Sequence, residues 1–127
     1  MSDMNAVVSA YGAAWLEDNE VERRRLLELA WSEDGVYQDP TADVSGREAL
    51  VQHIAGFRKR LPGATIVLTS GADHHHGKFH FSWKMIGPDG QVMLEGRDFG
   101  ELDREGRICC IAGFFGSPPP LPGSSDQ

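Results

Sequence analysis

Hydrophobic positions divide the chain into a first half with helical spacing and a second half in which apolar and polar residues alternate. The spacing predicts one helix that follows a cap at Asp3 and includes Trp15. A second helix is predicted to start near Asp18 or Asn19 and to include Trp31. Each of these helices would present one apolar stripe to a core.

A third helix and then a run of strands are predicted farther along the chain. Ser45 and Glu48 form a capping-box pattern, and Pro62-Gly63 would end the helix that this box opens. Beyond that point the period changes to two. Turn-forming residues then separate four predicted strands, 65–69, 74–86, 91–102 and 107–115. Helices followed by consecutive strands are typical of an α+β fold.

The turns at 87–90 and 103–106 allow the two faces of the predicted sheet to be assigned. If each turn holds four residues, the side chains that lie opposite each other on paired strands share a face. The face that we expect the helices to cover holds Phe79, Phe81, Trp83, Met85, Val92, Leu94, Ile111 and Phe115. The opposite face carries His, Lys, Glu and Arg, a mixture that suits water or a partner subunit.

Asp98 interrupts the apolar face. A lone carboxylate there is costly unless it is hydrogen-bonded or protonated. Gly96 and Gly113 leave room on the same face, and His75 is assigned to it as well. A buried acid beside free space predicts a small-molecule pocket. Two alternatives stay open: a structural ion pair at Asp98, or a turn of odd length that would direct Asp98 outward.

The composition excludes several classes of partner. The 127 residues carry a net charge of −7, which disfavours binding to the phosphate backbone of a nucleic acid. We expect a cytoplasmic protein, because the sequence has neither a signal peptide nor a run of 18 apolar residues that could span a membrane. The adjacent Cys109 and Cys110 are expected to be unpaired, buried thiols. No metal site is predicted, since only His74 and His76 of the histidine run share a face.

The length fits one folded domain, and the composition changes near its end. Residues 1–116 contain all of the predicted helices and strands. Residues 117–127 are rich in Pro, Gly and Ser and are expected to form a flexible tail.

Three segments carry a resemblance to a known family. They are the first-helix segment 7–15 with Tyr11, the Tyr-Gln-Asp-Pro segment 37–40, and the last hairpin with Gly96-Arg97-Asp98 and the Gly-Phe-Phe-Gly run 113–116. In these segments the chain resembles the nuclear-transport-factor-2-like (NTF2-like) superfamily, which includes ketosteroid isomerase and the SnoaL-like polyketide cyclases. The resemblance covers residues 5 to 116, and it implies a cone-shaped α+β fold. In that fold three N-terminal helices pack on a curved, mostly antiparallel sheet and enclose a pocket.

The resemblance also implies a function. It assigns Asp39 as a general base, and Tyr11 and a protonated Asp98 as hydrogen-bond donors to an oxyanion. We therefore expect acid/base chemistry on a small apolar carbonyl compound, either isomerisation or cyclisation, with no cofactor and no metal. By analogy with the family, we expect a homodimer formed through the outer sheet face.

A non-catalytic ligand binder or a protein-interaction module of the same fold is the alternative. In an enzyme, the three catalytic candidates should converge on one cavity. In a structural module, Asp39 should face its own backbone, and Trp15, Trp31 and Phe57 should fill the cavity. The residues expected to line a substrate pocket are His75, Phe79, Phe81, Trp83, Trp15, Ile111 and Phe115.

Overall fold

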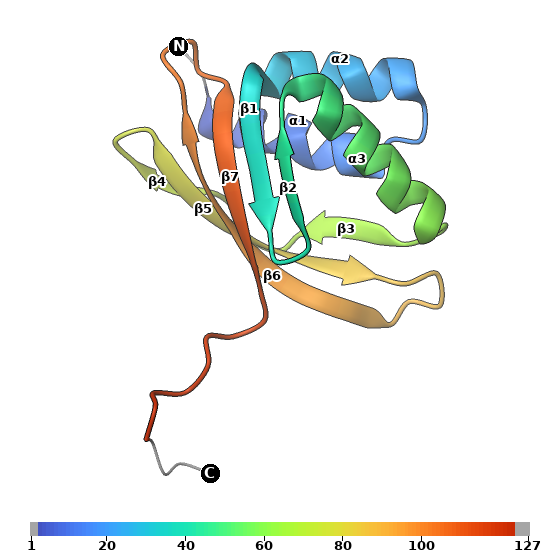
Figure 1. Cartoon of the computed structure of the whole chain (residues 1–127), viewed down its shortest axis with the longest axis vertical. Coiled ribbons are helices and arrows are strands. Elements are labelled where there is room, and N and C mark those ends of the chain that lie inside the picture. The colour runs from blue at the N-terminus through green and yellow to red at the C-terminus, as the bar shows by residue number, and fades with distance from the viewer. Residues whose placement is uncertain (1–2, 124–127) are drawn as a thin grey trace.

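The computed structural model describes residues 3–123, which form three helices and seven strands (Figure 1). The helices are α1 (Met4–Leu16), α2 (Glu20–Ala30) and α3 (Arg47–Arg60). The strands are β1 (Trp31–Asp39), β2 (Ala42–Ser45), β3 (Thr65–Leu68), β4 (Asp73–His75), β5 (Lys78–Ile86), β6 (Val92–Leu102) and β7 (Ile108–Phe115). The predicted α+β class is confirmed. Residues 1–2 and residues 124–127 of the predicted tail lie outside the described residues.

The first two helices begin where the sequence predicts. The side chain of Asp3 accepts a hydrogen bond from the Asn5 amide, and that of Asn19 accepts one from the Glu22 amide. The predicted end of the second helix is wrong, because α2 stops at Ala30 and Trp31 already belongs to β1. Trp31 pairs with β7, so its burial comes from the sheet and not from a helical stripe.

The third helix does not use the predicted capping box. Its N-cap is Gly46, with φ of 97° and no side-chain cap, whereas Ser45 ends β2. Glu48 instead forms an ion pair with Arg24 of α2 at 2.8 Å. A positive φ favours glycine, which moves the helix start one residue beyond the predicted serine. The helix ends before Pro62-Gly63, as predicted.

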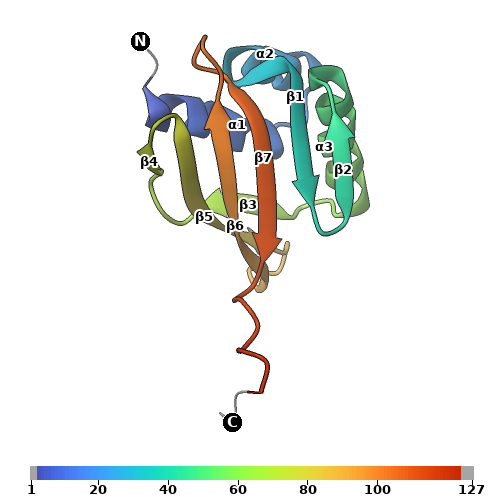
Figure 2. The same cartoon turned by 60° about the vertical axis from the view of Figure 1, so that its left-hand side comes forward.

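The sheet has the strand order β2-β1-β7-β6-β5-β3, and β4 pairs with β5. Neighbouring strands are antiparallel except for β1 and β7, which run parallel. The helices all lie on one side of this sheet (Figure 2). Their apolar residues and those of the inner sheet face form one core.

Two hairpins of the sheet each contain a loop of odd length and a bulge that compensates for it. Ile86 pairs with Val92 across residues 87–91, one residue more than the predicted turn. The register then shifts again, so that Met85 pairs with Leu94. Two one-residue shifts restore the original alternation, and Asp98 therefore faces inward as predicted.

The hairpin of β6 and β7 repeats this arrangement. Leu102 pairs with Ile108 across residues 103–107, and a bulge then brings Glu101 opposite Cys110. In both hairpins the residues thus pair with different partners than predicted, but the side chains beyond the bulge stay on the predicted face of the sheet. Val92 is the exception on the inner face: it lies between the loop and the bulge, and 47% of it is exposed.

The predicted strand 74–86 is wrong at its start, because a tight turn divides it into β4 and β5. The turn residues His76 and Gly77 have φ of 53° and 75°, as in a two-residue hairpin turn. His75 pairs with Lys78 and lies on the outer, exposed face, so its assignment to the face of Asp98 is also wrong. The same turn places His74 opposite the inward-facing Phe79, not on the outer face with His76.

The cysteines and the helix lengths were also subjects of prediction. Cys109 and Cys110 are free thiols as predicted, although both are half-buried and not fully buried. Over residues 3–123, no helix combines the length and the apolar character needed to cross a membrane.

Candidate active site

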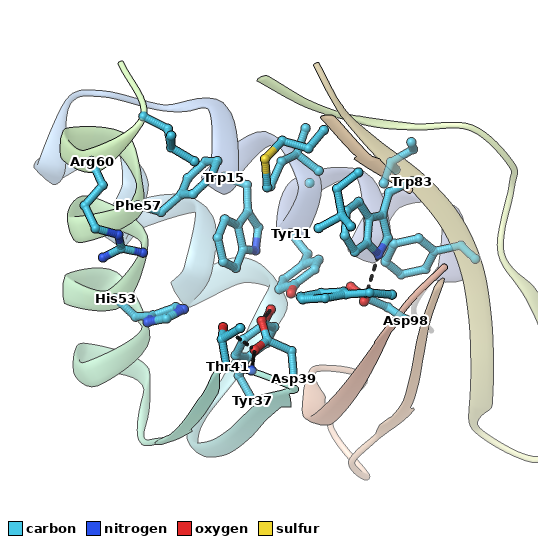
Figure 3. A pocket seen from close by; sticks show the side chains of 18 residues that line it. Tyr11, Trp15, Tyr37, Asp39, Thr41, His53, Phe57, Arg60, Trp83 and Asp98 are labelled. Atoms are coloured by element: carbon cyan, nitrogen blue, oxygen red, sulfur yellow. Dashed lines mark hydrogen bonds between the residues drawn. The ribbon is translucent and has the colours of Figure 1, made fainter. Parts of the chain in front are cut away.

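A cavity of about 230 Å³ lies between α1, α3 and the inner face of the sheet (Figure 3). Most of its wall is apolar or aromatic. That part of the wall consists of Tyr11, Gly12, Trp15, Tyr37, Phe57, Leu61, Ile66, Leu68, Phe81, Trp83, Met85, Leu94 and Phe115. The polar groups of the wall are fewer: Asp39, Thr41, His53, Arg60 and Asp98. A largely apolar cavity with a few polar groups is typical of a small-molecule site.

Asp98 is buried in the middle of β6, with 6% of its surface exposed. Its Oδ1 accepts a hydrogen bond of 3.0 Å from the indole Nε1 of Trp83. Burial raises the pKa of the Asp98 carboxyl to about 7, and the negative charge of Asp39 adds to the rise, while the Trp83 hydrogen bond opposes it. Asp98 can therefore hold a proton near neutral pH and donate it in a hydrogen bond.

Glycines on the inner face make room for Asp98 and its partner. A Cβ at Gly96 would lie 2.2 Å from the Trp83 ring, so the space predicted there is occupied by the indole that binds Asp98. A Cβ at Gly113 would lie 2.9 Å from Oδ1 of Asp98 and 3.4 Å from Cβ of Asp39. The lack of a side chain at Gly113 thus lets Asp39 and Asp98 lie on either side of this residue.

Asp39 lies at the end of β1, where the chain turns into β2. Its Oδ1 accepts hydrogen bonds of 2.8 Å from both the amide and the hydroxyl of Thr41. Its Oδ2 accepts a hydrogen bond of 2.5 Å from the hydroxyl of Tyr37. Three donors suit a carboxylate that carries a negative charge. Asp39 thus binds its own turn through one oxygen and Tyr37 through the other, and it borders the cavity.

Tyr11 projects from α1 into the centre of the cavity wall (Figure 3). Its ring is buried and stacks on Trp31, with ring centroids 5.5 Å apart. Burial, together with the negative charge of Asp98, raises the pKa of the Tyr11 hydroxyl well above its usual value. The hydroxyl therefore stays protonated and can act as a hydrogen-bond donor.

The structure brings Tyr11, Asp39 and Asp98 to one cavity. Of the residues expected to line a pocket, Trp15, Phe81, Trp83 and Phe115 border this cavity. Phe79 and Ile111 share the inner face but belong to the core beside it, and His75 lies on the outside. Trp31 is fully buried behind Tyr11, and neither Trp15 nor Phe57 fills the cavity.

Several residues of the cavity wall were not predicted from the sequence. Tyr37 lies two residues before Asp39 on the same strand, so the alternation of a strand could have placed both on one face. His53, Phe57 and Arg60 are spaced by three or four residues on α3, which puts them on one side of that helix. The ring of His53 borders the cavity and lies tilted against that of Tyr37, with centroids 5.6 Å apart.

Metal ligands are sparse in the part of the chain that the structure describes. Between residues 3 and 123, no three His, Cys, Asp or Glu side chains lie close enough together to hold a metal ion. The His75 and His76 rings contact each other through their Nδ1 atoms at 3.2 Å, and His80 contacts Asp73 at 3.0 Å, both on exposed parts of the surface.

Solved structures give the family context. No protein-family model and no curated protein sequence matches the chain. The chain resembles a SnoaL-like family protein from Agrobacterium tumefaciens strain C58, named as a candidate isomerase, with 34% identity, coverage of 92% of this chain and 100% of the other, and a TM-score of 0.85.

More distant structures share the fold. A protein with a cystatin-like fold from Methylobium petroleophilum PM1 is 18% identical over 97% of this chain and 81% of its own, with a TM-score of 0.74. A candidate SnoaL-like polyketide cyclase from Jannaschia sp. CCS1 is 13% identical over 91% of this chain and 89% of its own, with a TM-score of 0.66. Because the chain has the cone-shaped fold and matches the Agrobacterium protein over the whole length of that protein, it belongs to the SnoaL-like family of the NTF2-like superfamily.

Proposed function

We propose that the cavity catalyses cofactor-independent proton transfer next to the carbonyl group of a small apolar compound. The carboxylate of Asp39 removes a proton from the carbon beside the carbonyl. The electron pair moves into a new carbon–carbon double bond, and the negative charge collects on the carbonyl oxygen. Tyr11 and protonated Asp98 donate hydrogen bonds to that oxygen. In an isomerisation, the substrate has a carbon–carbon double bond beside this carbon, and Asp39 returns the proton to the far end of the resulting dienolate. In a cyclisation, the enolate carbon attacks a second carbonyl group, and Asp39 gives the proton to the alkoxide oxygen that forms.

The pairing of the two acids supports this proposal most directly. Asp39 and Asp98 line the same cavity, yet their surroundings differ. Asp39 accepts three hydrogen bonds, and Asp98 is buried with one indole donor. Enolisation needs a charged base and a neutral acid that border the same small cavity.

The apolar walls indicate what kind of molecule could enter. The cavity volume of about 230 Å³ lies below the roughly 300–1,000 Å³ that is usual for drug-sized ligands. A compound with a single ring or a short carbon chain fits this volume better than a large fused-ring system. Isomerase and cyclase roles are candidates for relatives of this fold, and both require the same first step.

Exchange of hydrogen for deuterium tests the first step without knowledge of the natural substrate. Small cyclic ketones in D₂O would be incubated with the protein, and loss of the α-hydrogen signals would be followed by NMR. We expect acceleration by the wild type and none by Asp39→Asn. Removing one oxyanion donor with Tyr11→Phe should slow the exchange by about 100- to 1,000-fold.

A matched control separates chemistry from a change of net charge. Asp73→Asn makes the same substitution on the exposed outer face, and it should leave the exchange rate unchanged. In parallel, phenol serves as an enolate mimic, and it should shift the NMR titration of Asp98. If no ketone exchanges and phenol leaves Asp98 unaffected, the non-catalytic binder becomes the better description.

We also propose that two copies associate through the outer sheet face. On that face Phe99 and Phe114 are 42% and 58% exposed, and their rings meet edge to face at 5.9 Å. His80 stacks on Phe99 at 5.2 Å. Neighbouring exposed aromatic rings often mark an interaction site.

Light scattering after gel filtration tests the association. The wild type should have the mass of a dimer, and Phe114→Asp should have that of a monomer. Leu121→Asp introduces the same charge at an exposed position beyond β7 and should remain dimeric. A monomeric wild type would contradict the proposal.

A further inference from the structure

The cavity has a second polar end, formed by His53 and Arg60 of α3. Figure 3 shows Arg60 directed toward His53 on one side of the cavity, with Asp98 and Trp83 on the other. Trp15 and Phe57 lie between the two ends and pack edge to face at 5.6 Å. A ligand that spans the cavity would therefore meet polar groups at both ends and aromatic rings between them.

Arg60 differs from its neighbour Arg58 in its contacts. Arg58 donates hydrogen bonds to Asp18 at 2.8 Å and to the carbonyl oxygen of Ala64 at 2.9 Å. Arg60 has no hydrogen bond or ion pair with any residue from 3 to 123. Arg60 is an exposed residue and nevertheless contributes to the wall of the cavity. An arginine fork with free donors beside an apolar cavity is suited to bind a planar anion.

Gly56 allows this position of Arg60. A Cβ at residue 56 would lie 3.3 Å from Nη1 of Arg60, so the guanidinium folds back along the helix over the glycine. A basic residue in the last helical turn also favours the helix dipole, but Arg58 and Lys59 already supply that charge. The dipole therefore does not explain why Arg60 faces the cavity.

The other charges of the cavity determine which end an anion would occupy. Asp39 carries negative charge near the Asp98 end and would repel a second anion there. Burial and the nearby charge of Arg60 lower the pKa of His53, although Asp39 opposes the shift, so its ring is neutral at neutral pH. Arg60 is then the cation available to an anionic group in the cavity, and neutral His53 can add a hydrogen bond.

We infer that the substrate is a small carbonyl compound that also carries a carboxylate, which Arg60 binds at the end of the cavity remote from Asp98. This inference rests on the proposed enolisation, since it uses the Tyr11 and Asp98 end for the carbonyl group. The apolar body of the substrate would lie against the cavity faces of Trp15 and Phe57. The volume of about 230 Å³ restricts the class to short or single-ring keto acids.

Binding of matched phenols tests the carboxylate. The phenol group reports the Asp98 end, and 4-hydroxybenzoate, 4-hydroxyphenylacetate and 3-(4-hydroxyphenyl)propanoate place a carboxylate at three distances from it. Each would be compared with its amide by calorimetry. At the best chain length, we expect the acid to bind the wild type about tenfold more tightly than the amide.

Variants of α3 assign that preference to one residue. Arg60→Gln should reduce the ratio of acid to amide affinity to about one. Arg60→Lys, which keeps the charge but not the planar fork, should give an intermediate ratio. Lys59→Gln is the matched control: it removes the same charge from an exposed neighbour that does not border the cavity, and it should leave the ratio unchanged.

The outcomes separate this inference from the proposed function. If phenol shifts the titration of Asp98 but no acid binds better than its amide, the carboxylate inference is wrong and the enolisation proposal stands. A preference that survives Arg60→Gln would also overturn the inference. If neither phenol nor any acid perturbs Asp98, the proposed function itself fails.

Discussion

The end of β1 and the middle of β6 each contribute an aspartate to the cavity, and the two regions treat the carboxyl group in opposite ways. Asp39 is half-buried and accepts three hydrogen bonds. Asp98 is buried and accepts one, from Trp83. The comparison shows that position along a strand decides the chemistry of an acid as much as its depth does.

The difference follows from where backbone donors are free. At a strand end, the chain leaves the ladder and its amides become available, so Thr41 can donate to Asp39. In the middle of a strand, the neighbouring amides are used by the ladder. Asp98 must therefore rely on a side-chain donor. Burial raises the pKa of its carboxyl group to about 7.

The largest expected effect comes from removing the ionisable group of β6. The folded state binds the Asp98 proton more tightly than the unfolded state, so stability falls as the pH rises from 3.8 to about 7, and the loss is complete above that range. Asp98→Asn cannot ionise. At pH 8 it should be more stable than the wild type by up to about 4 kcal/mol, and this advantage should vanish near pH 3.5. Urea unfolding across pH measures it.

The equivalent change at the strand end provides the contrast. Asp39→Asn should retain a pH dependence of stability, because Asp98 is still present. Its midpoint should move slightly downward, since the charge of Asp39 contributes to raising the pKa of Asp98. A pH profile for Asp98→Asn identical to that of the wild type would show that Asp98 is not the titrating group.

A smaller effect is expected from removing the single donor of Asp98. Trp83→Phe keeps an aromatic ring and deletes the indole N–H. The pKa of Asp98 should rise further, and at pH 8 the loss of a hydrogen bond to the charged acid should cost about 2 kcal/mol. NMR titration of the carboxyl group measures the first effect and urea unfolding the second.

Trp31 offers a matched control for that substitution. It is fully buried, and its Nε1 is an unpaired buried donor within the described part of the chain. Trp31→Phe makes the same truncation without breaking a hydrogen bond and should leave the pKa of Asp98 unchanged. If both variants shift Asp98 equally, the indole hydrogen bond does not control it.

The smallest effect is expected at the end of β1, where the donors are redundant. Tyr37→Phe removes one of the three hydrogen bonds to Asp39 and should cost about 1 kcal/mol of unfolding free energy. Thr41→Val removes a second, more exposed hydroxyl and should cost less than that. A loss as large as that of the Trp83 variant would mean that the two acids are supported alike.

The sequence predicted the fold class and the inward position of Asp98, because both depend on periodicity. It did not predict the start of α3 or the division of the strand at His76. Those features depend on a positive φ at Gly46 and at His76-Gly77, which alternation does not report. His75 was misplaced for that reason.

The candidate site was predictable in part. Tyr11 and Asp39 came from the resemblance to the family, and Asp98 from both the resemblance and the alternation. Tyr37 could have been added by alternation from Asp39, whereas His53 and Arg60 required knowledge of which face of α3 meets the cavity. That relation is set by packing between segments distant in sequence, and no local pattern contains it.

The compensated loop and bulge in each hairpin have an evolutionary consequence. A deletion in the loop 87–91 alone would turn Asp98 to the outer surface, and a deletion at Met93 alone would do the same. Together, the two deletions would restore the inward position. Gaps in these two places should therefore be epistatic, each harmful on its own, and an alignment of relatives should show them gained or lost as a pair.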